Sequence, residues 1–144
     1  MQKGQENFTK PFFLLLVFYT ACFVLLYVTS KVLIDSSILS EINFLNWDAM
    51  HYNTIQRDGY YTGMVAFFPL FPYIWKLTHL GSIGIGLLNG FIYMLSFAWL
   101  AVMFNIQSRR LLLLASTPAI IFMFLPFSES VFFLTSVILL TGLK

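Results

Sequence analysis

A group of side chains that could transfer a proton lies in one short stretch of the sequence, Trp-Asp-Ala-Met-His-Tyr at positions 47–52. On a helix, Asp48, His51 and Tyr52 are spaced i, i+3 and i+4, so they share one face. A carboxylate beside an imidazole and a phenol can act as a general acid or base. The same spacing also occurs in ordinary solvated helices with an interfacial Trp and Tyr, and spacing alone favours that simpler interpretation.

A second ionisable residue of interest is Glu129, which lies between Ser128 and Ser130 just after Pro126. Apolar runs flank this segment, and an ionisable residue at membrane depth is costly and by default points to function. A water-exposed position at the tip of a tight turn explains Glu129 equally well. The sequence has no zinc-ligand spacing, phosphate loop, nucleophile elbow or Asp-x-Asp pair, and it leaves a requirement for a divalent metal open.

The stretch Ala-Phe-Phe-Pro-Leu-Phe-Pro at 66–72 predicts a stiff aromatic corner. Pro69 and Pro72 each remove a backbone donor and fix φ. Because the stretch is apolar, we expect this corner to lie at a membrane surface. A plain kink where the chain enters the membrane is the simpler interpretation, and the stretch alone favours it.

The chain that positions these groups is too apolar for a soluble protein. Its 144 residues are 59% hydrophobic and 10% charged, with a mean hydropathy of +0.83. Soluble domains are about 45–50% apolar and about 25% charged, and they avoid large exposed apolar patches. The sequence has no basic cluster for nucleic acid beyond Arg109-Arg110, and its single cysteine, Cys22, cannot form an internal disulfide.

The apolar runs predict an all-α fold, a polytopic membrane bundle forming one domain with about four apolar segments. These segments are 12–34, 81–104, 111–125 and 131–143. The stretch 35–80 is too polar to cross a bilayer and is expected to be a large outer loop. It is predicted to contain a short helix over 47–58, with Asn46 as N-cap and Gly59 as its end, and an interfacial or re-entrant segment over 66–80. Gly86 and Gly90 predict close helix packing.

Basic residues near the predicted spans set the expected topology, because Lys and Arg favour the cytoplasmic side. With the N-terminus in the cytoplasm, the short basic segments lie inside, at Lys3, Lys10, Arg109, Arg110 and Lys144. The loop 35–80 and the turn at 126–130 then lie outside. Asp48 and Glu129 are therefore expected at the same membrane face.

Read together, these segments resemble the PIG-V family of GPI mannosyltransferases. The resemblance covers most of the stretch 45–132. It rests on Trp47-Asp48-Ala49-x-His51-Tyr52-x-x-Ile55, Gly59-Tyr60, Ala66-Phe67-Phe68-Pro69-x-Phe71-Pro72 and Pro126-Phe127-Ser128-Glu129-Ser130-x-Phe132. It implies a GT-C type glycosyltransferase that transfers a sugar, typically mannose from dolichol-phosphate mannose, at the extracytoplasmic or lumenal face. The acceptor would be a hydroxyl of a lipid or glycan.

The same resemblance implies roles for individual residues. The essential acidic residue of the family's first outer loop matches Asp48, which we expect to take the proton of the acceptor hydroxyl. Substrate contacts are expected from Trp47, His51, Tyr52, Arg57 and Glu129, with Arg57 or Lys76 neutralising the departing phosphate. The protein is expected in the plasma membrane of a bacterium or the endoplasmic reticulum of a eukaryote.

Two departures from the family affect these expectations. The pair Arg57-Asp58 differs from the family pattern, and family members run to several hundred residues with more spans. The chain is therefore expected to be the N-terminal portion of such an enzyme, as a truncated gene product, as one part of a split gene or as a fragment. The alternative is a non-catalytic small membrane protein or a remnant that keeps the fold. A channel or transporter subunit is disfavoured, because the spans 12–34 and 81–104 carry few polar residues.

Overall fold

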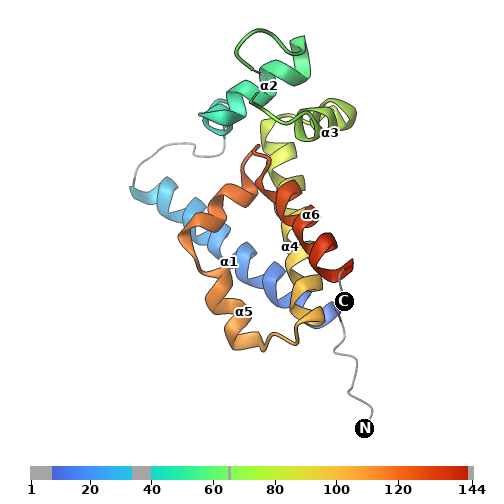
Figure 1. Cartoon of the computed structure of the whole chain (residues 1–144). Helices are drawn as coiled ribbons and strands as arrows, with labels where there is room; N and C mark the ends of the chain where they lie inside the picture. The colour runs from blue at the N-terminus through green and yellow to red at the C-terminus, as the bar shows by residue number, and fades with distance from the viewer. Residues whose placement is uncertain (1–7, 34–39, 65, 143–144) are drawn as a thin grey trace.

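The computed structural model describes residues 8–33, 40–64 and 66–142, and this part of the chain is helical with no strand (Figure 1). Lys3 and Lys144, which the topology prediction also uses, lie outside it. The elements follow in the order α1 (Thr9–Leu33), η1 (Asn43–Leu45), α2 (Asp48–Asp58), α3 (Leu70–Thr78), α4 (Ser82–Met103), α5 (Ser108–Ala115), η2 (Pro118–Phe124) and α6 (Glu129–Gly142).

Two of these helices are long and apolar enough to cross a membrane. They are Thr9–Val32 within α1 and Ser82–Met103, which is α4, with hydropathies of 2.4 and 1.8. Both agree with the predicted runs 12–34 and 81–104. The 3-10 helix η2 and α6 form a third candidate only if they count as one span, since they meet at a bend of 100°. The fold therefore offers two or three apolar helices of membrane length, consistent with a membrane protein.

The predicted segment 111–125 is not one helix, which corrects the sequence-based expectation. Helix α5 ends at Ala115, and η2 starts at Pro118. Proline has no backbone donor and disfavours a helical residue before it. The hydroxyls of Ser116 and Thr117 donate to backbone carbonyls of the preceding turn, at 2.8 and 2.9 Å. The Tyr19 hydroxyl of α1 donates to the Ala115 carbonyl at 3.2 Å, so side chains satisfy part of the broken backbone ladder.

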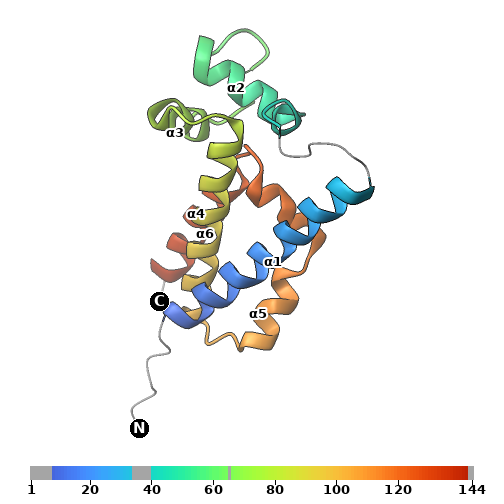
Figure 2. The same cartoon turned by 180° about the vertical axis from the view of Figure 1, so that it is seen from behind.

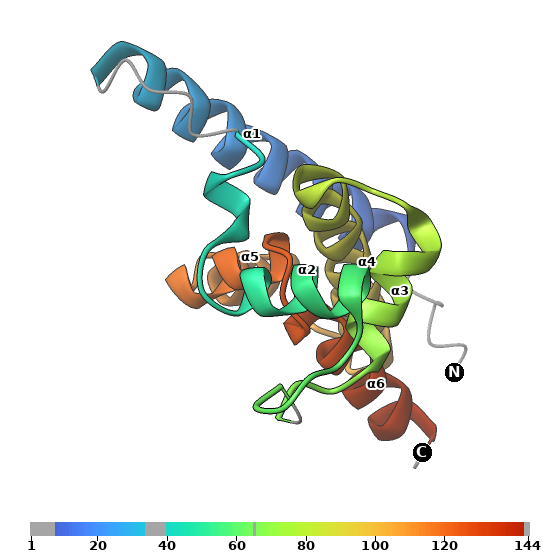
Figure 3. The same cartoon turned by 90° about the horizontal axis from the view of Figure 1, so that it is seen from above.

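The bundle has two apolar clusters at different heights. The larger cluster lies between α1, α4, α5 and η2 and includes Tyr19, Tyr93 and Phe124. The smaller one joins α2 and α3 to the ends of α4 and α6. Seen from behind, α1 crosses α4 obliquely (Figure 2). Seen from above, α2 and α3 lie across the end of the bundle (Figure 3). The helices α2 and α3 are thus fixed on one end of the apolar bundle.

The predicted packing role of the two small residues in α4 is confirmed. A Cβ on Gly90 would overlap the ring of Phe124, and one on Gly86 would lie 2.7 Å from the Phe124 carbonyl oxygen. The partner is η2 of the same chain. These glycines let the bent segment approach α4 closely, which brings the turn after η2 over the end of the bundle.

The start of α2 differs from the prediction, whereas its end agrees. Asn46 is not the N-cap, because its side chain donates to the Asn43 carbonyl at 2.9 Å. Trp47 occupies the cap position with φ 52°, without a side-chain cap bond. Gly59 ends the helix with φ 87°, and its N–H bonds to the Ile55 carbonyl at 2.9 Å. Glycine adopts such a positive φ without steric cost.

Candidate functional site

Helix α2 is anchored through one face of buried side chains. Ala49, Tyr52 and Ile55 recur every three residues along α2 and are buried. The Tyr52 ring packs edge-on against Phe67 and Phe71, with ring centroids 5.1 and 5.0 Å apart. Such aromatic pairs stabilise beyond the apolar area they bury. The aromatic corner at 66–72 therefore supports the helix that carries the candidate base.

The Tyr52 side chain also ties α2 to the turn before α6. Its hydroxyl donates to Ser128 Oγ at 2.9 Å. Burial raises the pKa of the Tyr52 phenol, and the negative charges of Glu129 and Asp48 raise it further, while the bond with Ser128 acts in the opposite direction. At neutral pH the phenol is therefore protonated and acts as a hydrogen-bond donor.

The two carboxylates singled out in the sequence influence each other electrostatically, because the charge of Asp48 acts on the Glu129 carboxyl. Both charges also act on the Tyr52 phenol. Asp48 is exposed at the first residue of α2, whereas Glu129 is half-buried at the first residue of α6. The structure thus brings together Asp48, Tyr52 and Glu129 with Ser128, and we call these four residues the carboxylate site.

One oxygen of Glu129 has no hydrogen-bond partner among the residues that the structure describes. Oε2 is buried, and nothing within the described ranges donates to it. Buried polar atoms are nearly always paired, and an unpaired one is unfavourable. An unpaired buried acceptor of this kind calls for an explanation, and a functional role is one.

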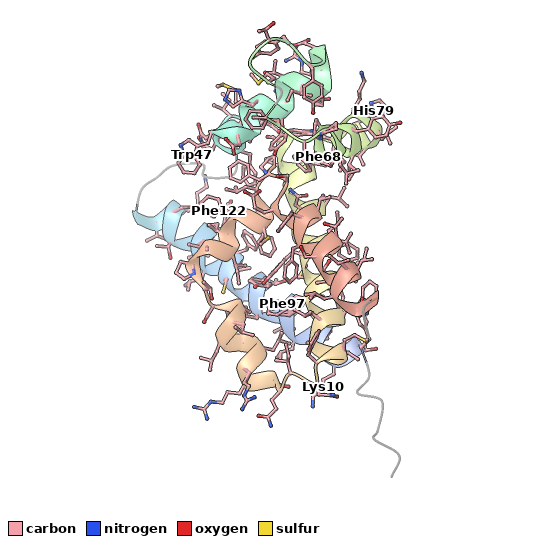
Figure 4. All side chains as sticks on the ribbon, viewed as in Figure 1. Lys10, Trp47, Phe68, His79, Phe97 and Phe122 are labelled. Carbon is pink, nitrogen blue, oxygen red and sulfur yellow. The ribbon has the colours of Figure 1, made fainter. Side chains whose placement is uncertain are left out.

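The remaining predicted residues lie at or beyond the edge of the site. His51 is half-buried, with its ring 5.0 Å from that of Phe67. Trp47 is 71% exposed, and the centroid of its ring lies 6.4 Å from that of Phe122. Both residues are labelled in Figure 4. Its positive φ is uncommon for a bulky residue, and such backbone strain often marks functional sites.

Two predicted basic residues are not brought to the carboxylate site. Arg57 lies in the last turn of α2, at the opposite end of the helix from Asp48. Lys76 lies in the last turn of α3. Both side chains are exposed. Neither is positioned to neutralise a charge that develops beside Asp48.

Sequence reasoning missed Asn89, which shapes the turn that holds Ser128 and Glu129. Asn89 is 1% exposed within α4, and its Nδ2 donates to the carbonyls of Leu125 and Phe127 at 2.6 and 2.8 Å. These carbonyls flank Pro126. The sequence did contain a signal, because Asn89 is a polar residue inside the apolar run 81–104 and such a residue needs a hydrogen-bond partner. The sequence could not show which carbonyls it would meet.

A second missed residue, Glu41, fixes the start of α4. Its Oε2 accepts hydrogen bonds from the Ser82 N–H at 2.5 Å, the Ile83 N–H at 3.3 Å and the Ser82 hydroxyl. The hydroxyl bond is the main cause that lowers the pKa of Glu41, and the two N–H bonds add to it. A carboxylate at a helix N-terminus is favourable. Here the capping residue lies 41 positions before Ser82 in the chain, so no local sequence motif predicts the cap.

The carboxylate site can combine an exposed proton acceptor, Asp48, with a protonated phenol and an unpaired carboxylate oxygen. Over the part of the chain that the structure describes, no three or more His, Cys, Asp or Glu side chains gather closely enough to hold a metal ion. No family model, curated protein or solved structure matches this chain.

Proposed function

We propose that this chain is a GT-C type membrane glycosyltransferase that moves mannose from a polyprenyl-phosphate donor to a hydroxyl of a lipid or glycan acceptor. The observation that carries the proposal is the convergence of Asp48 and Glu129 across the Tyr52–Ser128 hydrogen bond. The motifs that resemble the PIG-V family supply the residues on both sides of this contact. The proposal thus rests on a match between those motifs and the geometry.

The distribution of basic residues supports a site on the extracytoplasmic or lumenal face. Lys10 lies at the lower end of the bundle in Figure 4, and α5 starts at the same end with Arg109 and Arg110. The helices α2 and α3 lie at the other end. Basic residues favour the cytoplasmic side, so this orientation exposes the carboxylate site outside. The membrane would be the plasma membrane in a bacterium or the endoplasmic reticulum in a eukaryote.

In the proposed reaction, Asp48 is the general base. Its carboxylate takes the acceptor hydroxyl proton as the oxygen forms a bond to C1 of the sugar. The bond from C1 to the phosphate oxygen breaks, and polyprenyl phosphate leaves with the electron pair. A positioned base of this kind typically contributes about 10²- to 10⁴-fold to the rate. The exposure of Asp48 at the helix start suits an acceptor that arrives from outside.

The other residues of the carboxylate site bind and orient substrate in this proposal. Glu129, which is half-buried beside Ser128, binds the sugar through the accessible part of its side chain. Tyr52 positions the site through Ser128. Trp47 and His51 form its aromatic edge, where sugar rings can pack. Arg57 and Lys76 lie in the last turns of α2 and α3 and are assigned no role beside Asp48 in this proposal.

The test is a transfer assay in membranes that contain the full chain. Radiolabelled polyprenyl-phosphate mannose is the donor, and a lipid extract of the source cells supplies acceptors. We expect Asp48→Asn to lower transfer by about 10²-fold or more. Asp58→Asn is the matched control, because it makes the same change at the other end of α2 and should leave transfer intact.

Retained transfer by the Asp48→Asn variant would contradict the role of this carboxylate. Absence of transfer by the unaltered chain would instead favour the alternative of a non-catalytic membrane protein. Circular dichroism of each variant separates loss of chemistry from loss of fold.

A further inference from the structure

A groove of about 520 Å³ lies between α2 and α3, away from the carboxylate site. Its floor includes the buried Ile55 and Pro72, and the rings of Phe68 and Tyr73 form exposed walls. The volume falls within the range of about 300–1,000 Å³ that is usual for small-molecule sites. The groove is thus large enough, and apolar enough, for a segment of hydrocarbon chain.

The walls of this groove are held rigidly before any ligand binds. Pro69 and Pro72 fix φ in the first turn of α3. The Tyr60 hydroxyl, which belongs to a lining residue, donates to the Phe67 carbonyl at 2.7 Å. A preformed groove avoids the entropic cost of ordering its walls when a ligand binds.

The groove lies at the level where a membrane-length helix ends. Helix α3 ends at Thr78, and α4 begins at Ser82, with α3 lying across the end of α4 in Figure 1. Helix α4 has 22 residues, or about 33 Å at 1.5 Å per residue. That length matches a hydrocarbon core of about 30 Å. The start of α4, and with it the groove, is therefore at the depth of lipid headgroups.

The groove also carries a single positive charge. Among its described lining residues, Lys76 alone is charged. Lys76 is exposed and makes no ion pair within the described residues. An apolar groove with one free ammonium at its rim complements an amphiphile that has an anionic head and a hydrocarbon tail.

We propose that this groove binds an anionic phospholipid of the membrane leaflet at this end of α4. Its acyl chain lies along Phe68 and Tyr73, and its phosphate pairs with the Lys76 ammonium. The binding does not depend on the proposed transferase activity. The Asp48→Asn variant, which should abolish transfer, should bind the phospholipid normally.

The test places the full chain in phosphatidylcholine nanodiscs with a small fraction of spin-labelled phosphatidylglycerol. The measurement is the immobilised fraction of the label, compared with spin-labelled phosphatidylcholine. Lys76→Gln should reduce the preference for phosphatidylglycerol about five-fold, the effect expected for one Lys near a membrane surface. Lys76→Arg should restore the preference, because it keeps the charge.

Two further variants separate the contributions of charge and chain. Arg57→Gln makes the same charge change on α2 at a residue that does not line the groove, and it should leave the preference intact. Tyr73→Ser removes an exposed apolar wall and should lower immobilisation of both labelled lipids. Soluble sn-glycerol 3-phosphate should not displace the label.

Three results would overturn the proposal. The first is an unchanged preference in Lys76→Gln. The second is an equal loss in Arg57→Gln, which would indicate a general surface-charge effect. The third is displacement by glycerol 3-phosphate, which would indicate an anion site that does not need the chain.

Discussion

The Tyr52 hydroxyl donates to Ser128 Oγ over 2.9 Å, although 76 positions separate the two residues in the chain. This bond joins α2 to the turn before α6. Because Asp48 lies one helical turn before Tyr52 and Glu129 follows Ser128 directly, the bond also sets how the two carboxylates face each other. Its removal should therefore affect both stability and the geometry of the carboxylate site.

The Tyr52–Ser128 bond can be measured by a double-mutant cycle. Tyr52→Phe keeps the ring contacts with Phe67 and Phe71 and removes only the hydroxyl. We expect a loss of about 1 kcal/mol in the free energy of unfolding, as for a typical hydrogen bond. Ser128→Ala should cost a similar amount, and the double variant should cost less than the sum of the two. Unfolding in mixed detergent micelles gives these values, and strict additivity would show that the two hydroxyls do not interact.

The Glu129 carboxylate should favour function at the expense of stability. Glu129→Gln removes the negative charge of a carboxylate that has one buried, unpaired oxygen. It also removes the electrostatic repulsion between this carboxylate and Asp48. We expect the free energy of unfolding to stay equal or to rise by about 1 kcal/mol, while mannosyl transfer falls. Stability and transfer are measured on the same preparation. A clear loss of stability would mean that the carboxylate has a structural partner instead.

Glu41 should give the fold a dependence on acid pH. Its pKa is lowered below the usual value of 4.5, first by the hydrogen bond from the Ser82 hydroxyl. A depressed folded-state pKa contributes stability that is present above about pH 4.5 and is lost as the pH falls through the lower folded-state value. Thermal unfolding measured at decreasing pH should therefore show falling stability in this window. In Glu41→Gln, stability at neutral pH should be lower and this part of the acid dependence should be absent.

Close packing at Gly90 predicts a large effect of one methyl group. Gly90→Ala would drive a Cβ into the Phe124 ring, and overpacking of this kind costs about 1–3 kcal/mol. Gly142→Ala is the control, because nothing lies within 4 Å of its Cβ position in α6. Alanine is the better helix former, so this control should be neutral or slightly stabilising. Equal effects of the two variants in detergent unfolding would contradict the packing of η2 on α4.

The local patterns of the sequence predict the continuous helices well. The apolar runs 12–34 and 81–104 correspond to α1 and α4, and the polar stretch 47–58 corresponds to α2. These elements depend on composition and on nearby end signals such as Gly59. The prediction of one continuous helix over 111–125 was wrong, because the apolar composition of this run gives no sign of the break before Pro118. That break is supported by the Tyr19 hydroxyl of another helix, which no local pattern contains.

The candidate site was predictable in part for a similar reason. Chain topology predicts that Asp48 and Glu129 lie at one membrane face, and the Tyr52–Ser128 hydrogen bond joins the two segments that carry them. The hydrogen bonds of Asn89 and Glu41 join residues more than thirty positions apart. Such contacts depend on how helices pack, so composition and spacing do not reveal them. Arg57 lies far from Asp48 because the two residues are at opposite ends of the 11-residue helix α2.

The hydrogen bonds from Asn89 to the carbonyls of Leu125 and Phe127 have a consequence for the order of folding. Helix α4 precedes the turn around Pro126 in the chain and carries the amide that pairs with these carbonyls. A buried carbonyl without a partner is unfavourable. The turn should therefore take its shape only when it packs on α4, so that α4 acts as a template for the segments that follow it.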